Sequence, residues 1–177
     1  MTEGNKDAFS AMFRRFYPML FQYGSKITTD KELLEDVIQE LFLDLWQKPT
    51  SQQLHSIKAY LLQALKFKLY KSFRKPNLAS TQTKEEDYGF DLSRETMLIN
   101  KEEDDERLQK LVAALAKLTP RQREVIYLKI YKGLSYEEVS EVMQLNYQVV
   151  RNLLYTALKA FKKLCTLVAM HLIFFEP

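Results

Sequence analysis

The stretch GLSYEEVSEVMQLNYQVVRNLLYTALKAFKK, residues 133–163, contains two helix start signals about a dozen residues apart. Ser135 is followed three residues later by Glu138, which is a capping-box pattern, and Asn146 is of a type preferred at helix N-caps. We therefore expect a short helix from Tyr136 to Met143, a turn of about three residues, and a longer helix from Tyr147. This spacing is typical of a helix-turn-helix, whose second helix enters the major groove of DNA.

The second of these helices separates cleanly into two faces at about 100° per residue. Its apolar face consists of Val150, Leu153, Leu154, Ala157, Phe161 and Leu164. Its polar face consists of Gln148, Arg151, Asn152, Tyr155, Lys159 and Lys162. A plain amphipathic surface helix accounts for the separation alone. The polar face, however, lacks carboxylates and places base-reading residue types before phosphate-binding lysines, which favours groove insertion over a simple helical hairpin.

The rest of the chain is also predicted to be helical. Residues 7–27 have helical spacing with Pro18 inside the run, where it could bend or divide the helix. Thr29 with Glu32 forms a capping-box pattern for a helix that ends near residue 47, and a third helix is expected over 56–74.

The second half adds one more strong helix start, at Thr119 with Pro120 and Gln122, and a stop near Gly133. Sustained period-two alternation is not found, so the predicted fold is all-α. We expect two small helical domains, at residues 1–75 and 105–177, joined by an acidic flexible linker at 76–104.

Charge is distributed in blocks, although the net charge is only +3. Residues 58–75 contain six basic and no acidic residues, and residues 84–107 contain ten acidic and four basic ones. This pattern suggests two modules joined by a charged linker, and a merely soluble tether is one explanation of the acidic block.

Composition excludes several classes of protein. With 46% hydrophobic residues, the 177-residue chain can build a core, and its single cysteine, Cys165, excludes an intrachain disulfide and a multi-cysteine metal site. Neither a phosphate-binding glycine loop nor a nucleophile beside a histidine is found, so we predict no enzyme, cofactor, metal or small-molecule substrate. The polar start and the short apolar stretches predict a cytoplasmic protein.

The helix expected over 31–47 has a core stripe made of Leu34, Val37, Ile38, Leu41 and Leu45. The opposite stripe contains Asp36, Gln39, Glu40 and Asp44. Leu43 lies within that acidic stripe and Trp46 at its margin, which is typical of a protein-contact patch, although a solvated face remains possible.

The segment LAKLTPRQREVIYLKIYKGLSYEEVSEVMQLNYQVVRNLLYTALKAFKKL resembles the promoter-reading C-terminal domain of RNA polymerase sigma factors of the extracytoplasmic-function (ECF) type. The resemblance implies that the −35 element is read by Gln148, Arg151, Asn152, Tyr155 and Thr156, with Lys159 and Lys162 on phosphates. Gln144 stands where the family's turn usually carries Gly, so either a strained left-handed residue or a slightly different turn is expected there. Ser140 replaces the usual Ala.

The segment LEDVIQELFLDLWQ resembles the sigma-factor helix that grips the clamp helices of the polymerase's largest subunit. The resemblance assigns this contact to Asp36, Gln39, Glu40, Leu43 and Trp46. The next helix resembles the segment that opens and reads the −10 element. The residues assigned there are His55, Lys58, Lys66, Phe67, Tyr70, Lys71, Arg74 and Lys75. Phe67 and Lys71 depart from the family's usual Asn and Asp, and the family's flipped-base pocket would correspond to the loop around Gln52, Gln53 and His55.

The chain is accordingly identified as a member of the ECF sigma factors, which direct core RNA polymerase to promoters and assist promoter melting. The implied partners are core polymerase, promoter DNA and an anti-sigma factor. The alternatives are a helix-turn-helix regulator that binds duplex DNA without joining polymerase, and a helical enzyme or ligand-binding bundle. The apolar tail CTLVAMHLIFFEP extends past the resemblance, and we favour core packing for it over an interface or an anti-sigma contact.

Overall fold

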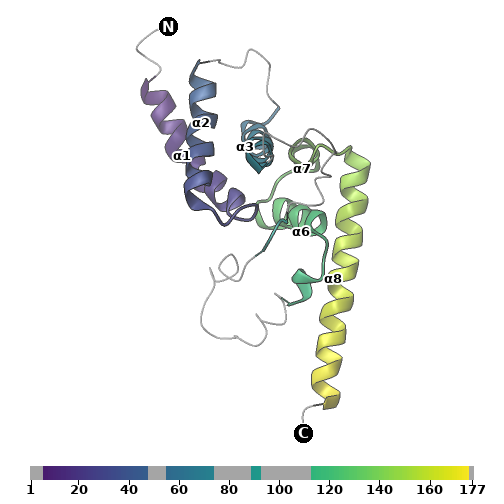
Figure 1. The fold of residues 1–177 in the computed structure, drawn as a ribbon. Helices are drawn as coiled ribbons and strands as arrows, with labels where there is room; N and C mark the ends of the chain where they lie inside the picture. The colour runs from purple at the N-terminus through teal and green to yellow at the C-terminus, as the bar shows by residue number, and fades with distance from the viewer. Residues whose placement is uncertain (1–5, 48–54, 74–88, 93–112, 176–177) are drawn as a thin grey trace, which may run out of the picture. The chain divides into compact units, whose positions relative to one another are not determined.

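The computed structural model describes residues 6–47, 55–73, 89–92 and 113–175, with side chains described as far as residue 163. These residues form helices, turns and irregular segments, and no strand occurs among them, which confirms the all-α prediction. The chain divides into two compact units, Met1–Lys84 and Glu85–Pro177. Figure 1 shows their helices, and each unit is described by itself.

Unit 1 is a three-helix domain made of α1 (Lys6–Gly24), α2 (Lys31–Gln47) and α3 (Ile57–Phe73). Each helix packs against the other two. The fully buried core includes Leu20, Tyr23, Leu34, Ile38, Phe42, Leu61, Leu62, Leu65 and Leu69. Most of these residues recur at helical spacing, so burial of amphipathic faces accounts for the packing.

The α1–α2 connection differs from the prediction in its cap. Asp30, not Thr29, accepts a hydrogen bond from the backbone N–H of Leu33 through Oδ1, at 3.0 Å. Because α2 begins at Lys31, Asp30 occupies the N-cap position, so the Thr29–Glu32 capping box was wrong by one residue. Thr28 supports this cap by accepting from the Asp30 N–H at 3.1 Å.

Two residues of α1, Pro18 and Gly24, bear on the shape and packing of the helix. Helix α1 continues through Pro18, so the proline does not divide it. The helix ends at Gly24, where an added Cβ would overlap the Leu34 side chain. The absence of a side chain at Gly24 therefore allows α1 and α2 to approach closely.

Unit 2 contains α6 (Pro120–Ile126), the π-helical turn η3 (Tyr127–Tyr131), α7 (Tyr136–Met143) and α8 (Tyr147–Phe175). Both predicted capping boxes are present, at Thr119 with Gln122 and at Ser135 with Glu138. The π-helical turn was not predicted. It continues α6 toward Gly133, which has a φ of 66° and lies where the stop signal was expected.

Within the part of the chain that the structure describes, no helix is long and apolar enough to cross a membrane. No group of His, Cys, Asp and Glu suited to a metal ion occurs in that part either. Of the predicted linker at 76–104, only residues 89–92 are described, and the remainder lies outside the described residues.

Candidate nucleic-acid and protein interfaces

The turn between α7 and α8 is built by a left-handed residue. Gln144 has φ 52° and ψ 41°, which confirms the conformation expected at this position. Its neighbour Leu145 donates its backbone N–H to the Ser140 carbonyl at 3.1 Å, closing the end of α7. Asn146 then caps α8 by accepting from the Val149 N–H at 2.8 Å. The sequence thus sets the angle at which α8 leaves α7.

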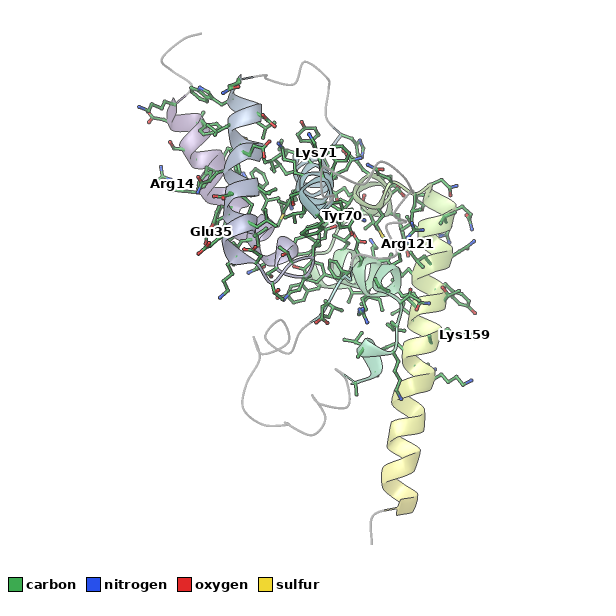
Figure 2. The ribbon with its side chains drawn as sticks, in the orientation of Figure 1. Arg14, Glu35, Tyr70, Lys71, Arg121 and Lys159 are labelled. Carbon is green, nitrogen blue, oxygen red and sulfur yellow. The ribbon has the colours of Figure 1, made fainter. Side chains whose placement is uncertain are left out.

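Helix α8 packs against α6 and α7 with one face. Val150, Leu154 and Ala157 are buried on that face. The residues predicted to read DNA are all exposed, and these are Gln148, Arg151, Asn152, Tyr155, Thr156, Lys159 and Lys162. Tyr155 is the most open of the large hydrophobic side chains described, at 67%. In Figure 2, Lys159 extends outward from α8.

Local contacts restrain the first half of this polar face. Gln148 donates from Nε2 to Asn152 Oδ1 at 3.1 Å, one helical turn away. The Arg151 guanidinium lies 5.8 Å from the centre of the Tyr147 ring. Restrained donors and acceptors lose less conformational entropy on meeting base edges, so this half of α8 suits direct readout.

The outer face of α2 combines carboxylates with apolar side chains. Asp36, Gln39 and Glu40 are exposed, and Leu43 among them is 56% exposed. Trp46 is 40% exposed while its ring packs edge-on against Phe9, with centroids 4.8 Å apart. This contact holds the indole ring in place. We call the five residues of this face the α2 patch: Asp36, Gln39, Glu40, Leu43 and Trp46.

One edge of the α2 patch is tied to α3 by an ion-pair network that sequence reasoning missed. Lys68 Nζ lies 2.7 Å from Glu40 Oε1 and 2.6 Å from Asp44 Oδ2. Burial lowers the pKa of Lys68, but hydrogen bonds to Asp44 and Glu40 outweigh it, so the pKa is raised overall. The available signal was the pair of carboxylates one turn apart on α2, facing a helix rich in lysines.

The residues assigned to the −10 element differ in how far they are exposed. His55, Lys58, Phe67 and Lys71 are exposed, with Phe67 at 63%, and Tyr70 is half-buried. Arg74 and Lys75, like Gln52 and Gln53 of the preceding loop, lie outside the described residues. The described members of the predicted set are therefore His55, Lys58, Lys66, Phe67, Tyr70 and Lys71.

Lys66 departs from its assignment as a phosphate contact. It is only 7% exposed, and its ammonium lies 5.6 Å from the centre of the Tyr70 ring. The reason is that α3 buries a wide arc that includes Leu62 and Leu69, while Tyr60 and Ala64 are half-buried. Lys66 therefore lies on the buried side of α3.

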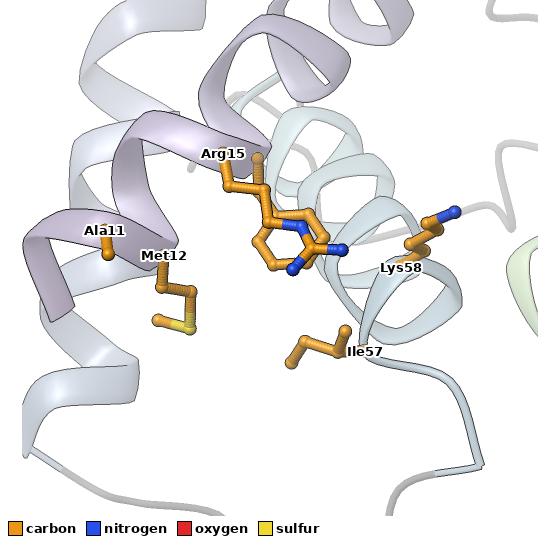
Figure 3. A pocket seen from close by; sticks show the side chains of 6 residues that line it. Ala11, Met12, Arg15, Ile57 and Lys58 are labelled. Atoms are coloured by element: carbon orange, nitrogen blue, oxygen red, sulfur yellow. The ribbon is translucent and has the colours of Figure 1, made fainter. Parts of the chain in front are cut away.

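A hollow of about 380 Å³ lies between α1 and the start of α3 (Figure 3). Ala11, Met12, Phe16 and Ile57 form its apolar lining, and Arg15 and Lys58 add positive charge. The Arg15 guanidinium lies 5.6 Å from the centre of the Phe16 ring. None of the described lining residues is acidic, so the hollow suits a planar apolar group carrying negative charge.

Comparison with known families matches both units. Residues 12–77 match the model for sigma-70 region 2, and residues 108–161 match the model for sigma-70, region 4. The ECF RNA polymerase sigma factor SigK of Mycobacterium ulcerans is 25% identical over 169 residues, covering 92% of this chain and 88% of that protein. The chain belongs to the ECF group of the sigma-70 family.

One further relative and two solved structures are also similar to this chain. The ECF sigma factor SigK of Mycolicibacterium vanbaalenii is 23% identical over 172 residues, covering 92% of this chain and 84% of that protein. The sigma factor RpoE of Bartonella quintana, solved with the anti-sigma factor NepR, gives a TM-score of 0.59 at 22% identity, covering 90% and 97% of the two chains. CnrH, solved with the cytosolic domain of CnrY, gives 0.58 at 21% identity, covering 91% and 89%.

The structure of this ECF sigma factor adds exposed side chains that the sequence assignment left out. Tyr147, Val149 and Leu158 of α8 are each 41–42% exposed. Tyr147 also contacts Arg151, as described above, and stacks edge-on with Tyr136 of α7 at 5.6 Å. Apolar side chains near the predicted base-reading residues can contact thymine methyl groups. The signal that could have found them was their closeness to Arg151 in the helix, four residues or fewer for Tyr147 and Val149 and seven for Leu158.

Proposed function

We propose that this ECF sigma factor divides promoter recognition between its two units, with the α2 patch binding core RNA polymerase. The observation that carries the proposal is Leu43, which stays exposed in an acidic frame on the same chain as a helix-turn-helix. A regulator that only binds duplex DNA needs no such patch in its other domain. Clusters of this composition are typical of protein interfaces.

In unit 2, α8 reads the −35 element from the major groove. Arg151 and Asn152 have the bidentate geometry suited to guanine and adenine edges, and Gln148 orients Asn152. Lys159 and Lys162 lie further along the helix, where phosphates are met. Exposure of every member of this set, together with the absence of carboxylates from it, supports the assignment.

In unit 1, α3 contributes to opening the −10 element. Phe67 offers an exposed ring on which an unpaired base can stack, and Lys58 and Lys71 offer cations for the strand's phosphates. The hollow beside Arg15 and Lys58 has the size and chemistry for one unstacked base with its phosphate. Arg74 and Lys75 remain predicted members of the same set.

The remaining partners follow from the family. Two solved relatives are held by an anti-sigma factor or by the cytosolic domain of another protein, and we propose an anti-sigma partner for this chain as well. No small-molecule substrate or cofactor is needed, since bond-making belongs to the polymerase. The site of action is where polymerase and promoter meet, in the cytoplasm.

The test uses two neighbouring charge reversals on α2. Asp36→Arg changes the α2 patch, whereas Glu35→Arg makes the same charge change about 100° around the helix on an exposed residue outside it. Glu40→Arg is less clean because it also breaks the ion pair with Lys68. We expect Asp36→Arg to lower affinity for core polymerase at least tenfold and to remove promoter-dependent transcription, with Glu35→Arg near wild type. Wild-type activity of both variants would refute the α2 patch as the contact with core polymerase.

A further inference from the structure

A short segment of the predicted linker is docked on unit 2. Phe90 is 2% exposed and Leu92 is 7% exposed. Gly89, just before Phe90, and Asp91, between the two, are exposed. The Phe90 ring lies 5.5 Å from the Tyr127 ring, centre to centre, at an angle of 59°. The burial of Phe90 and its ring contact with Tyr127 show that side-chain packing holds this segment on unit 2.

The backbone of this segment is also held. Arg123 of α6 donates from Nε to the Phe90 carbonyl at 2.6 Å. The same guanidinium donates from Nη1 to the carbonyls of Ala116 and Leu118, each at 3.0 Å. A single planar, permanently charged group therefore joins the linker segment to the turn that precedes α6. We call Phe90, Leu92 and Arg123 the linker clasp.

The clasp changes which residues connect the two units. Without it, the connection would run from Phe73, the last residue of α3, to Ala113, the next described residue of unit 2, which is 40 positions along the chain. With it, the connection ends at Phe90, only 17 positions after Phe73. A fully extended chain spans about 3.3–3.6 Å per residue, so the greatest possible span falls from about 140 Å to about 60 Å.

We infer that Phe90 is a positioning residue that docks the linker on unit 2 and so limits how far apart the two promoter-binding units can act. The clasp also redistributes the acidic block. Six of its ten carboxylates, at positions 95 and 102–106, follow Leu92 and precede Ala113, so both ends of their segment are fixed to unit 2. The connection itself carries three, at positions 85–87. The consequence for promoter spacing rests on the proposed function, but the shortened connection does not.

The deciding experiment inserts the same ten Gly and Ser residues at two places. Insertion after Ser80 lengthens the connection, while insertion after Thr96 lengthens only the segment between the clasp and α6. The two proteins match in length and composition, and both insertion points lie outside the described residues. Spin labels at Ser72→Cys and Lys117→Cys, both exposed positions, in a Cys165→Ser chain report the separation of the units by pulsed EPR.

With the clasp in place, only the first insertion should increase the label distance, by about 6 Å for coil-like chains of 17 and 27 residues. Phe90→Ala should increase the label distance by about 12 Å. In the Phe90→Ala background, the insertion after Thr96 should also increase that distance. Asp91→Ala, an exposed neighbour, is the matched control and should leave the distance unchanged. Equal effects of the two insertions in the wild-type background would overturn the inference.

Promoter spacing is then measured with core polymerase on templates whose spacer is longer by two base pairs, about 7 Å. The insertion after Ser80 should raise use of the long spacer at least twofold relative to the best spacer, and the insertion after Thr96 should not. If both insertions give the same spacer profile, the clasp has no role in spacing. If the unmodified chain gives no promoter-dependent transcription, the proposed function fails, while the EPR distances still decide whether the clasp shortens the connection.

Discussion

Helices α8 and α3 have similar compositions but were predicted with different success. Both carry lysines and aromatic residues, and both were assigned to DNA. Helix α8 packs against neighbours with one face, so every residue of its predicted polar face is exposed. Helix α3 packs against both α1 and α2, and its lysines are divided among burial, an ion-pair network and solvent.

The difference shows when helical periodicity is sufficient to locate a binding face. When a helix packs with one face only, its polar face is exposed to solvent, and the rotation of about 100° per residue is enough to identify that face. On a helix wedged between two others, the buried arc widens, and a basic residue on its margin can be covered or paired. The lysines of α3 therefore need a structure to be assigned individually.

The largest expected effect concerns Arg151 on α8. Arg151→Ala should cost about 1–3 kcal/mol in binding the best −35 sequence and should relax the preference at one base position, because a base contact is lost. Selection on promoters with a randomised −35 element, using the chain with core polymerase, measures both effects.

Lys159→Ala is the matched control for Arg151→Ala. It should weaken all −35 sequences alike and lower the salt slope of binding by about 1, since a phosphate contact carries no sequence information. If Arg151→Ala also weakened every sequence equally, α8 would be a phosphate-binding helix and the contrast with α3 would disappear.

The second prediction separates two neighbouring residues of α3. Phe67→Ala should cost about 1–3 kcal/mol in opening the −10 element, because one base loses its stacking surface. Lys66→Met should leave melting and its salt dependence unchanged, since the Lys66 ammonium lies over Tyr70 and away from solvent. Fluorescence of a base analogue in the −10 element measures melting. A drop of about 1 in the salt slope for Lys66→Met would restore Lys66 to the phosphate-binding set.

The third prediction concerns Lys68 between α2 and α3. Lys68→Met should lower the free energy of unfolding of unit 1 by about 0.2–1 kcal/mol, because both carboxylate partners are exposed and screened by solvent. Trp46 is the single tryptophan, so its fluorescence during denaturant unfolding reports unit 1. Lys71→Met, at an exposed position on the same helix, should change stability less.

The pH dependence of this effect has a definite sign. The pKa of Lys68 is raised in the folded chain, so its contribution is present at neutral pH and is lost as the pH rises through that pKa. The stability difference between wild type and Lys68→Met should therefore shrink in strongly alkaline solution. A difference that is constant across this range would mean that the Lys68 stem, and not its charge, stabilises the α2–α3 contact.

Local signals in the sequence predicted much of this molecule because they act within one or two turns. The capping boxes at Thr119 and Ser135 and the cap at Asn146 were found from residue types at fixed spacing, whereas the left-handed Gln144 was expected from the family resemblance. What the sequence did not reveal depends on contacts between distant segments. Lys68 and Glu40 lie 28 positions apart, and Arg123 and Phe90 lie 33 positions apart, so a local pattern can suggest one side of each contact but cannot identify its partner.

The assignments of function also depend on whether the signal is local or comes from distant segments. The helix-turn-helix and the α2 patch were recognisable because each lies within one helix or one helical pair. Phe90 was placed in a linker because its neighbours are polar and acidic, and only its burial against Tyr127 distinguishes it. The exact length of chain between the two units is therefore a tertiary property of this protein.

The last prediction tests the turn between α7 and α8. Gln144→Gly should raise the free energy of unfolding of unit 2 by about 0.5–1 kcal/mol, because glycine adopts a positive φ without the Cβ clash that glutamine meets. The gain is partly offset by the greater freedom of glycine in the unfolded chain. Glu141→Gly, three residues earlier inside α7, should instead destabilise by about 1 kcal/mol, since its backbone is helical. Calorimetry measures both variants. If Gln144→Gly destabilised as much as Glu141→Gly, the turn would not require a left-handed residue, and the orientation of the reading helix would have to come from the packing of α8 on α6 alone.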